Sequence, residues 1–188
     1  MINLAIFASG AGSNAEKIIE HFKGNENIRV ALIFCNKPGA GVLKIAEKHG
    51  IRSILIEKEG FFSPESCLLA LKEHQIDFIV LAGFLWKIPD ALVNAYRGKI
   101  VNIHPALLPN YGGKGMYGMR VHEAVINAGV SESGITIHYV DEHYDEGDII
   151  FQAKCSIEPG DTPEILAQKI HILEHRHFPE VIERLLRS

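Results

Sequence analysis

The chain has 188 residues, of which 47% are hydrophobic, and this length and composition are typical of one well-filled core. The formal net charge of -4, with both signs spread along the chain, provides no basic stripe for nucleic acid and no polybasic patch for a membrane surface. We therefore predict a single domain over residues 1–188 that binds neither nucleic acid nor membranes.

The start of the chain and the cysteines indicate a cytoplasmic protein. The chain begins on an apolar segment without a positively charged leader, and no apolar run approaches the length of a membrane span. Cys35, Cys67 and Cys155 are odd in number and widely spaced, which favours reduced thiols in the core over disulfides or a zinc knuckle.

Apolar segments alternate with amphipathic ones over the first 102 residues, which is typical of a Rossmann-like, doubly wound α/β fold with a mostly parallel sheet. Because most of these segments are apolar on both faces, we expect them to lie buried between helices. The predicted strands are Leu4–Ala8, Val30–Cys35, Ser53–Ile56, Phe78–Ala82 and Ile100–Asn102.

The later part of the chain predicts an antiparallel extension of this sheet. Two predicted strands, Gly134–Val140 and Asp148–Ala153, flank an acidic loop. Helix start signals occur at Ser63-Pro64-Glu65 and at Asp161-Thr162-Pro163-Glu164, each with a capping residue before a proline. The second signal predicts a long C-terminal helix that bends near Pro179.

A glycine-rich loop follows the first predicted strand and precedes a helix. Backbone N–H groups at a helix start, approached closely because glycine has no side chain, bind phosphate, and Gly12, Ser13 and Asn14 occupy this position. The loop matches the dinucleotide fingerprint only in part, since Asn36-Lys37 stand where an acidic residue usually holds the ribose. We expect one phosphate rather than a pyrophosphate; the alternative is a tight turn without a ligand.

The segment Asn102–Pro109 places an amide, an imidazole and two prolines at the end of a predicted strand, where α/β folds bind ligands. Strand alternation puts Asn102 and His104 on one face and Ile103 in the core. An amide donor beside an imidazole suits a reaction that develops an oxyanion and moves a proton, as acyl transfer does. The alternative is a structural histidine capped by a backbone carbonyl.

The acidic loop 141–148 carries five carboxylates. If Asp145 approaches His104, its charge would raise the pKa of the imidazole and fix its orientation, although position alone does not select one carboxylate. A solvated loop is the alternative. The ligand spacing differs from that of hard-cation loops, so we expect no metal here.

The segment His171-Ile172-Leu173-Glu174-His175 matches a zinc-peptidase pattern, but nothing nearby in the sequence supplies a third ligand. We therefore expect no metal at this segment either. Glu174 is expected to border the active cleft and to bind a substrate amine; the alternative is the ordinary polar face of a helix.

Together these motifs resemble the phosphoribosylglycinamide formyltransferases of purine synthesis, and the resemblance spans nearly the whole chain. The glycine loop Ser9–Asn14 is similar to the substrate-phosphate loop of that family, and Asn102–Pro109 to its catalytic segment. The resemblance continues through Leu81–Leu85 on the folate side, Gly134–His138, Asp145 with Gly147, and Glu174-His175.

The resemblance implies that 10-formyltetrahydrofolate, a co-substrate and not a permanently bound cofactor, donates a formyl group to the amine of glycinamide ribonucleotide on the route to IMP. It implies that Asn102 holds the formyl oxygen and that protonated His104, kept charged by Asp145, is the general acid. It also implies a monomer or homodimer without a metal. The implied ribonucleotide ligands are Gly12, Ser13, Asn14 and Glu174, and the implied folate ligands are Leu85, Trp86, Lys87, Ile88 and Asn102.

Two segments depart from the family pattern. Pro64-Glu65 stand where relatives often carry a basic residue for the folate glutamate tail, and residues 110–118 are richer in glycine, which suggests a mobile lid.

The alternative enzymes are a formyltetrahydrofolate hydrolase, a methionyl-tRNA formyltransferase or another folate-dependent formyltransferase; the first two usually carry an additional domain. The non-enzymatic alternative is a nucleotide-binding module.

Overall fold

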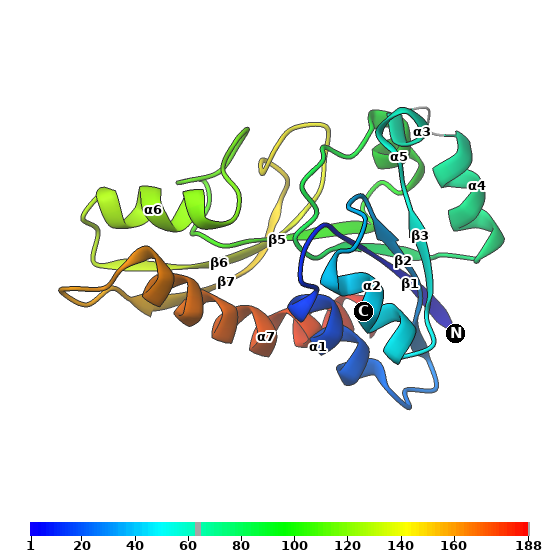
Figure 1. Ribbon diagram of the computed structural model, residues 1–188, viewed down its shortest axis with the longest axis horizontal. Coiled ribbons are helices and arrows are strands. Elements are labelled where there is room, and N and C mark those ends of the chain that lie inside the picture. The colour runs from blue at the N-terminus through cyan, green and yellow to red at the C-terminus, as the bar shows by residue number, and fades with distance from the viewer. Residues whose placement is uncertain (63–64, 188) are drawn as a thin grey trace. The chain divides into compact units, whose positions relative to one another are not determined.

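The computed structural model describes residues 1–62 and 65–187, and the chain divides into two compact units, Met1–Val101 and Asn102–Ser188. The single domain expected from the sequence stays a prediction. The first unit contains, in chain order, β1 (Ile2–Ala8), α1 (Ser13–Phe22), β2 (Ile28–Cys35), α2 (Gly41–Lys48), β3 (Arg52–Leu55), α3 (Lys58–Phe62), α4 (Glu65–Glu73), β4 (Phe78–Leu81) and α5 (Asp90–Ala95) (Figure 1).

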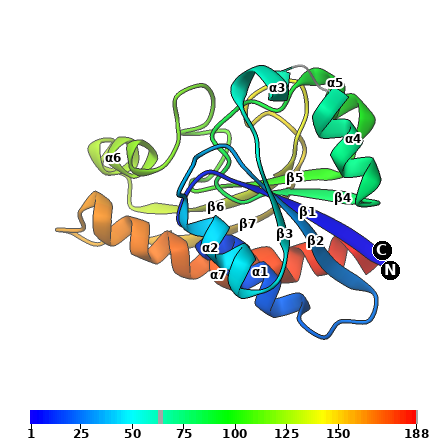
Figure 2. The ribbon, with the colours of Figure 1, turned by 45° about the vertical axis from the view of Figure 1, so that its right-hand side comes forward.

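The first unit contains parallel strands in the order β3-β2-β1-β4. Strand β1 is buried almost along its whole length, as the apolar run Leu4–Ala8 predicts. Helices α1 and α2 cover one face of these strands, and α4 and α5 lie on the other (Figure 2). The parallel, doubly wound arrangement predicted from the alternating segments is confirmed in this unit.

The helix start predicted at Ser63-Pro64-Glu65 falls partly on residues 63–64, which lie outside the described residues. Helix α4 is described from Glu65 onward.

Strand β5 (Ile100–His104) crosses from the first unit into the second, which continues with α6 (Met119–Asn127), β6 (Glu132–Tyr139), β7 (Ile149–Ser156) and α7 (Pro163–Arg187). Strands β6 and β7 pair antiparallel, which confirms the predicted extension. Gly134 is required at this pair, because a Cβ there would collide with the carbonyl oxygen of Ala153 on the partner strand.

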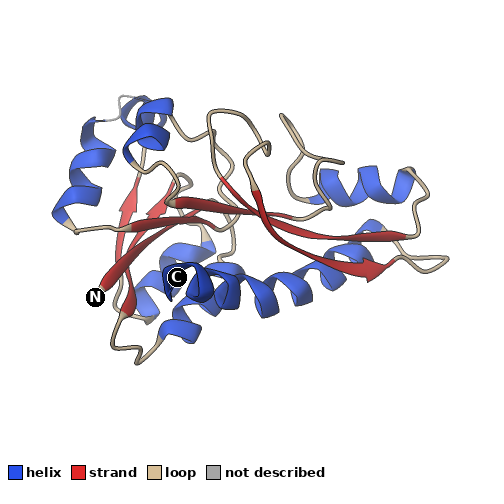
Figure 3. Cartoon of the chain, turned by 180° about the vertical axis from the view of Figure 1, so that it is seen from behind, coloured by secondary structure: helices blue, strands red, loops and turns tan. Residues whose placement is uncertain are grey.

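The long C-terminal helix is confirmed as α7, which packs on β6, β7 and α6 (Figure 3). Its start has the expected cap: Ile165 N donates to Thr162 Oγ1 at 3.3 Å, and Pro163 occupies the first turn. The helix continues through the buried Pro179 without interruption.

The three cysteines are free, as predicted. Cys35 and Cys67 are buried, and burial raises the pKa of Cys67 to about 12, which makes it an inert thiol. Cys155 is only partly buried, so its assignment to the core was wrong. It lies on β7, whose side chains alternate between partly buried and exposed positions.

Among the described residues, no helix is long and apolar enough to cross a membrane.

Candidate active site

Strand β5 ends at His104, two residues beyond its predicted end, so Asn102 and His104 both belong to the strand. Asn102 is partly buried, and His104 is only 3% exposed. Since alternate residues of a strand share a face, the amide and the imidazole lie on the same side, with Ile103 buried on the other. The sequence prediction for these three residues is confirmed.

The His104 imidazole has an oxygen near each of its nitrogens. Its Nε2 donates to the backbone carbonyl of Tyr111 at 2.8 Å, and its Nδ1 lies 3.6 Å from Asp145 Oδ2. The carbonyl cap and the carboxylate partner were considered as separate possibilities from the sequence, and the structure contains both. Tyr111 and Asp145 each have a φ of 57°, an unusual conformation for residues other than glycine.

The protonation of His104 differs from the sequence-based expectation. Burial lowers its pKa below the ordinary value, and the attraction of Asp145, the Tyr111 carbonyl and Glu174 offset this lowering only in part. Asp145 therefore raises the pKa of His104 as expected, but burial outweighs this contribution, because an imidazole that is 3% exposed loses most of its hydration. The neutral imidazole is the main form near neutral pH.

Asp145 is the carboxylate of the acidic loop that approaches His104. Burial acts to raise its pKa, but the neighbouring His138 and His104 side chains and the Gly113 N–H together lower it below the ordinary value. The Gly113 N–H donates to Asp145 Oδ2 at 2.9 Å, and His138 Nε2 lies 3.6 Å from Oδ1. Asp145 is therefore a largely buried anion whose Oδ2 accepts from Gly113 N–H and whose Oδ1 lies close to the His138 ring.

His138, near the end of β6, is a site residue that the sequence analysis did not select. Its Nδ1 lies 2.8 Å from the Tyr139 carbonyl and donates to it, so Nε2 accepts from Asn102 Nδ2 at 3.1 Å. The side chain is only 2% exposed. A second histidine near a predicted strand end, just before the acidic loop, was the signal that could have indicated it.

The turn that follows β5 is held by Thr136 on β6. The Thr136 hydroxyl donates to the Ala106 carbonyl at 2.7 Å and accepts from Leu108 N at 2.9 Å. Gln152 Nε2 on β7 donates to the Leu108 carbonyl at 3.0 Å. These buried and partly buried hydrogen bonds fix the backbone directly after His104, which limits the orientations available to that imidazole.

A cleft of about 390 Å³ opens beside the acidic loop. It is lined by Leu108, Pro109, Gly112, Gly113, Tyr144, Asp145, Glu146, Gly147 and Ile149. Gly112 lies so close to this wall that a Cβ there would be 2.5 Å from Leu108 Cδ2 and 3.3 Å from Asp145 Cβ. The cleft is therefore bounded by backbone on one side and by the buried carboxylate on another.

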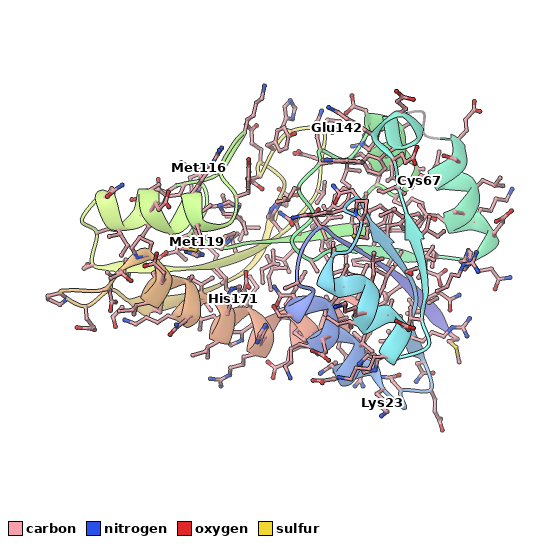
Figure 4. All side chains as sticks on the ribbon, in the orientation of Figure 1. Lys23, Cys67, Met116, Met119, Glu142 and His171 are labelled. Atoms are coloured by element: carbon pink, nitrogen blue, oxygen red, sulfur yellow. The ribbon has the colours of Figure 1, made fainter. Side chains whose placement is uncertain are left out.

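Glu174 lies on α7 and is buried, with 5% of its surface exposed. Its Oε2 lies 3.0 Å from Nδ1 of His171, a labelled residue on the same helix, and this hydrogen bond raises the pKa of the half-exposed His171 (Figure 4). The charge of Glu174 also acts to raise the pKa of His104 and of the buried His122 on α6, against the larger effect of burial.

Within residues 1–62 and 65–187, no group of three or more His, Cys, Asp or Glu side chains is arranged to hold a metal ion.

In the first unit, the predicted phosphate loop lies at the start of α1. Gly12 precedes the helix with a φ of 84°, and Ser13 and Asn14 are its first two residues. The first N–H groups of a helix have no carbonyl partner within that helix, so they point out of its N-terminus. The predicted position of these three residues at a helix start is confirmed.

The predicted folate segment Leu85–Ile88 follows β4 in the same unit. Ile88 is buried, whereas the Leu85 side chain is 50% exposed. The Trp86 ring packs 5.7 Å from the Phe61 ring and 6.1 Å from the Phe84 ring, measured between centroids. Lys87 Nζ lies 3.2 Å from Asp90 Oδ1 at the start of α5. Aromatic packing therefore supports this segment from Phe61 on α3 and from Phe84 in the loop after β4.

The comparison with known families covers both units, because a family model described as formyl transferase matches residues 2–182. The chain belongs to the formyl transferase family. A relative named phosphoribosylglycinamide formyltransferase from Bacillus subtilis is 41% identical over 99% of this chain and 95% of its own length. A chloroplastic relative from Arabidopsis thaliana with the same enzyme name is 42% identical over 95% of this chain.

Solved structures of formyl transferase relatives share the fold. The phosphoribosylglycinamide formyltransferase from Bacillus halodurans is 43% identical with a TM-score of 0.89, covering 98% of this chain and 95% of that one. A glycinamide ribonucleotide transformylase from Geobacillus kaustophilus is 41% identical with a TM-score of 0.90, covering 99% of each chain. The predicted fold class is thereby confirmed.

The chloroplastic relatives are longer than this chain. The matched segment spans 63% of the Arabidopsis protein and 60% of the Vigna unguiculata protein.

Proposed function

We propose that the protein transfers a formyl group from 10-formyltetrahydrofolate to the amine of 5-phosphoribosylglycinamide, a step toward IMP. The observation that carries this proposal is the buried array at the end of β5, in which Asp145 lies beside His104 and His138 lies beside Asn102. Membership of the formyl transferase family and the names of relatives at 41% to 44% identity support the choice of substrates.

The proposed reaction forms a bond between the amine nitrogen and the formyl carbon and breaks the bond between that carbon and the folate nitrogen. The formyl oxygen becomes an oxyanion in the tetrahedral intermediate. Asn102 donates one amide N–H to His138, and its second N–H is available for this oxyanion. The attacking amine loses a proton, the leaving folate nitrogen gains one, and no covalent enzyme intermediate is needed.

His104 is the general acid of this proposal. Because burial lowers its pKa, the imidazolium is a minor form at neutral pH but a stronger acid than an exposed one. Asp145 increases the population of that form, and the developing oxyanion would increase it further. We propose that the Nε2 proton, which is hydrogen-bonded to the Tyr111 carbonyl, is transferred to the folate nitrogen.

The substrate contacts of this proposal are assigned residue by residue. In the first unit, Gly12, Ser13 and Asn14 bind the ribonucleotide phosphate through the start of α1, and the folate contacts residues 85–88, that is Leu85, Trp86, Lys87 and Ile88. In the second unit, Asn102 contacts the formyl end of the folate, and the buried Glu174 binds the glycinamide amine. The folate is a co-substrate; the cytoplasmic location and the monomeric or homodimeric state stay predictions.

The test is to mix the purified protein with a 10-formylfolate donor and glycinamide ribonucleotide and to follow the deformylated folate spectroscopically. Turnover that depends on both substrates is expected. Turnover without the amine would indicate a hydrolase instead, and absence of turnover under either condition would refute the enzymatic proposal. His104→Asn should lose most of the rate, whereas His143→Asn, an exposed histidine of the acidic loop, is the matched control that should retain it.

A further inference from the structure

Ser9 is a buried polar residue directly after β1, with 4% of its surface exposed. Its backbone N–H donates to the Gly83 carbonyl at 3.1 Å, and its Oγ accepts from the backbone N–H of Leu85 at 2.9 Å. Both partners belong to the segment that follows β4. A single serine therefore holds this segment by its backbone and by its side chain.

The two segments meet because β1 and β4 are parallel neighbours. Phe7 pairs with Leu81, and Ala82 N donates to the Phe7 carbonyl at 2.9 Å, so both strands end at the same edge of the sheet. The bond from Ser9 N to the Gly83 carbonyl lies directly beyond this pairing. Beyond Gly83, whose φ is 74°, the backbone turns away from the strand direction, and the Ser9 hydroxyl takes over as the acceptor for Leu85.

Ser9 directly precedes one proposed substrate-binding loop and is hydrogen-bonded to the other. The next five residues, Gly10–Asn14, form the loop to which we assign the ribonucleotide phosphate, and Leu85 begins the segment 85–88 to which we assign the folate. The Leu85 side chain is 50% exposed, whereas the Ser9 hydroxyl beneath it is buried. A buried acceptor thus anchors an exposed ligand-binding loop to the other substrate loop.

We propose that Ser9 is a positioning residue that couples the two substrate loops, so that binding of the ribonucleotide at Gly10–Asn14 favours the folate-binding position of residues 85–88, and the reverse. The inference rests on the proposed function, since it uses the substrates assigned there. The coupling is reciprocal because it is a difference in binding free energy between the singly and doubly occupied states. Ser9 itself contacts neither reacting atom.

The test uses Ser9→Ala in the full chain and measures binding of tetrahydrofolate, the expected folate product, by calorimetry with and without glycinamide ribonucleotide. Without the hydroxyl, the Leu85 N–H has lost its acceptor, so the dissociation constant for tetrahydrofolate should rise on the order of tenfold. The factor by which the ribonucleotide tightens folate binding should fall toward one. The KM for the folate donor should rise by a similar factor, with kcat changed less than threefold.

Ser133→Ala is the matched control, because Ser133 is 3% exposed and its Oγ has no hydrogen-bond partner among the described residues. It should change neither folate binding nor the coupling. If Ser9→Ala fails to fold, Ser9→Cys, which is slightly larger and carries a weaker acceptor, should give a smaller loss in the same direction. Amide exchange at Leu85 should be faster in either Ser9 variant.

The outcomes separate this inference from the proposed function. If the wild-type protein binds neither tetrahydrofolate nor ribonucleotide, the proposed function fails and this inference fails with it. If the wild type binds both and Ser9→Ala matches it in folate affinity and coupling, only the role of Ser9 is refuted. An equal loss in Ser133→Ala would also refute it, because the effect would then come from general destabilisation.

Discussion

Asp145 Oδ2 lies 3.6 Å from Nδ1 of His104, and the Asp145 and His104 side chains are 12% and 4% exposed. The other oxygen of the same carboxylate lies 3.6 Å from Nε2 of His138. One largely buried carboxylate therefore faces two imidazoles. The charge of this carboxylate offsets, in part, the lowering of the His104 pKa by burial.

Replacing the carboxylate tests this arrangement most directly. Asp145→Asn retains the shape of the side chain, and Asn tolerates the φ of 57° that Asp145 adopts. The variant removes the attraction that partly offsets burial, so the pKa of His104 should fall further below its ordinary value. NMR titration of the His104 ring should show this shift, and kcat should fall on the order of 10²–10⁴-fold.

The control for this variant is Asp148→Asn, an exposed carboxylate of the same loop. It should leave the His104 titration and kcat close to wild type. An unchanged His104 titration in Asp145→Asn would show that the pair is not electrostatically coupled.

Gly12→Ala tests whether the start of α1 requires glycine. Gly12 has a φ of 84°, and a Cβ there would lie 2.8 Å from Cα and Cβ of Val42 and 2.9 Å from Ile45 Cδ1. Strain and overpacking together should cost about 2–4 kcal/mol of unfolding free energy. Ribonucleotide binding should weaken as well, because the helix N–H groups shift with the loop. Urea denaturation and calorimetry measure the two effects.

Gly24→Ala separates the two contributions to that loss. Gly24 has a φ of 79°, and a Cβ added there would meet no atom within 4 Å beyond its chain neighbours. This variant therefore carries the cost of the backbone conformation alone, about 1–2 kcal/mol. A loss in Gly24→Ala as large as that in Gly12→Ala would contradict the steric part of the argument.

The hydrogen bond between His171 and Glu174 predicts a pH-dependent contribution to stability. The pKa of His171 is raised in the folded state, so the folded state binds the proton more tightly than the unfolded chain. The contribution is fully present below the unfolded pKa of about 6.5 and is lost as pH rises through the higher folded value. His171→Ala should therefore lower the melting temperature by roughly 1 °C at pH 5.5 and by less at pH 8.5.

The matched control for His171→Ala is His143→Ala, another exposed histidine close to a carboxylate. Its melting temperature should track wild type at both pH values. A larger loss in His171→Ala at pH 8.5 than at pH 5.5 would reverse the sign and contradict the assignment.

The sequence could predict local features and those that follow from strand periodicity. Apolar runs such as Leu4–Ala8 indicated buried parallel strands, and the glycine loop indicated a helix N-terminus. The contact between Asn102 and His138 joins residues 36 positions apart, so no local pattern contains it. Whether the His104 pKa rises or falls depends on how completely the fold removes water from that imidazole. The charged residues of the sequence do not determine this loss of hydration.

Trp86 is the only tryptophan of the chain and lies in the segment proposed to bind folate, which makes its emission a reporter of that segment. Its ring packs against Phe61 and Phe84, so a ligand on residues 85–88 should alter its environment. After correction for folate absorption with free tryptophan under the same conditions, saturating tetrahydrofolate should change Trp86 emission by at least about a tenth, whereas ribonucleotide alone should change it less. Unchanged emission at folate saturation proved by calorimetry would place the folate elsewhere.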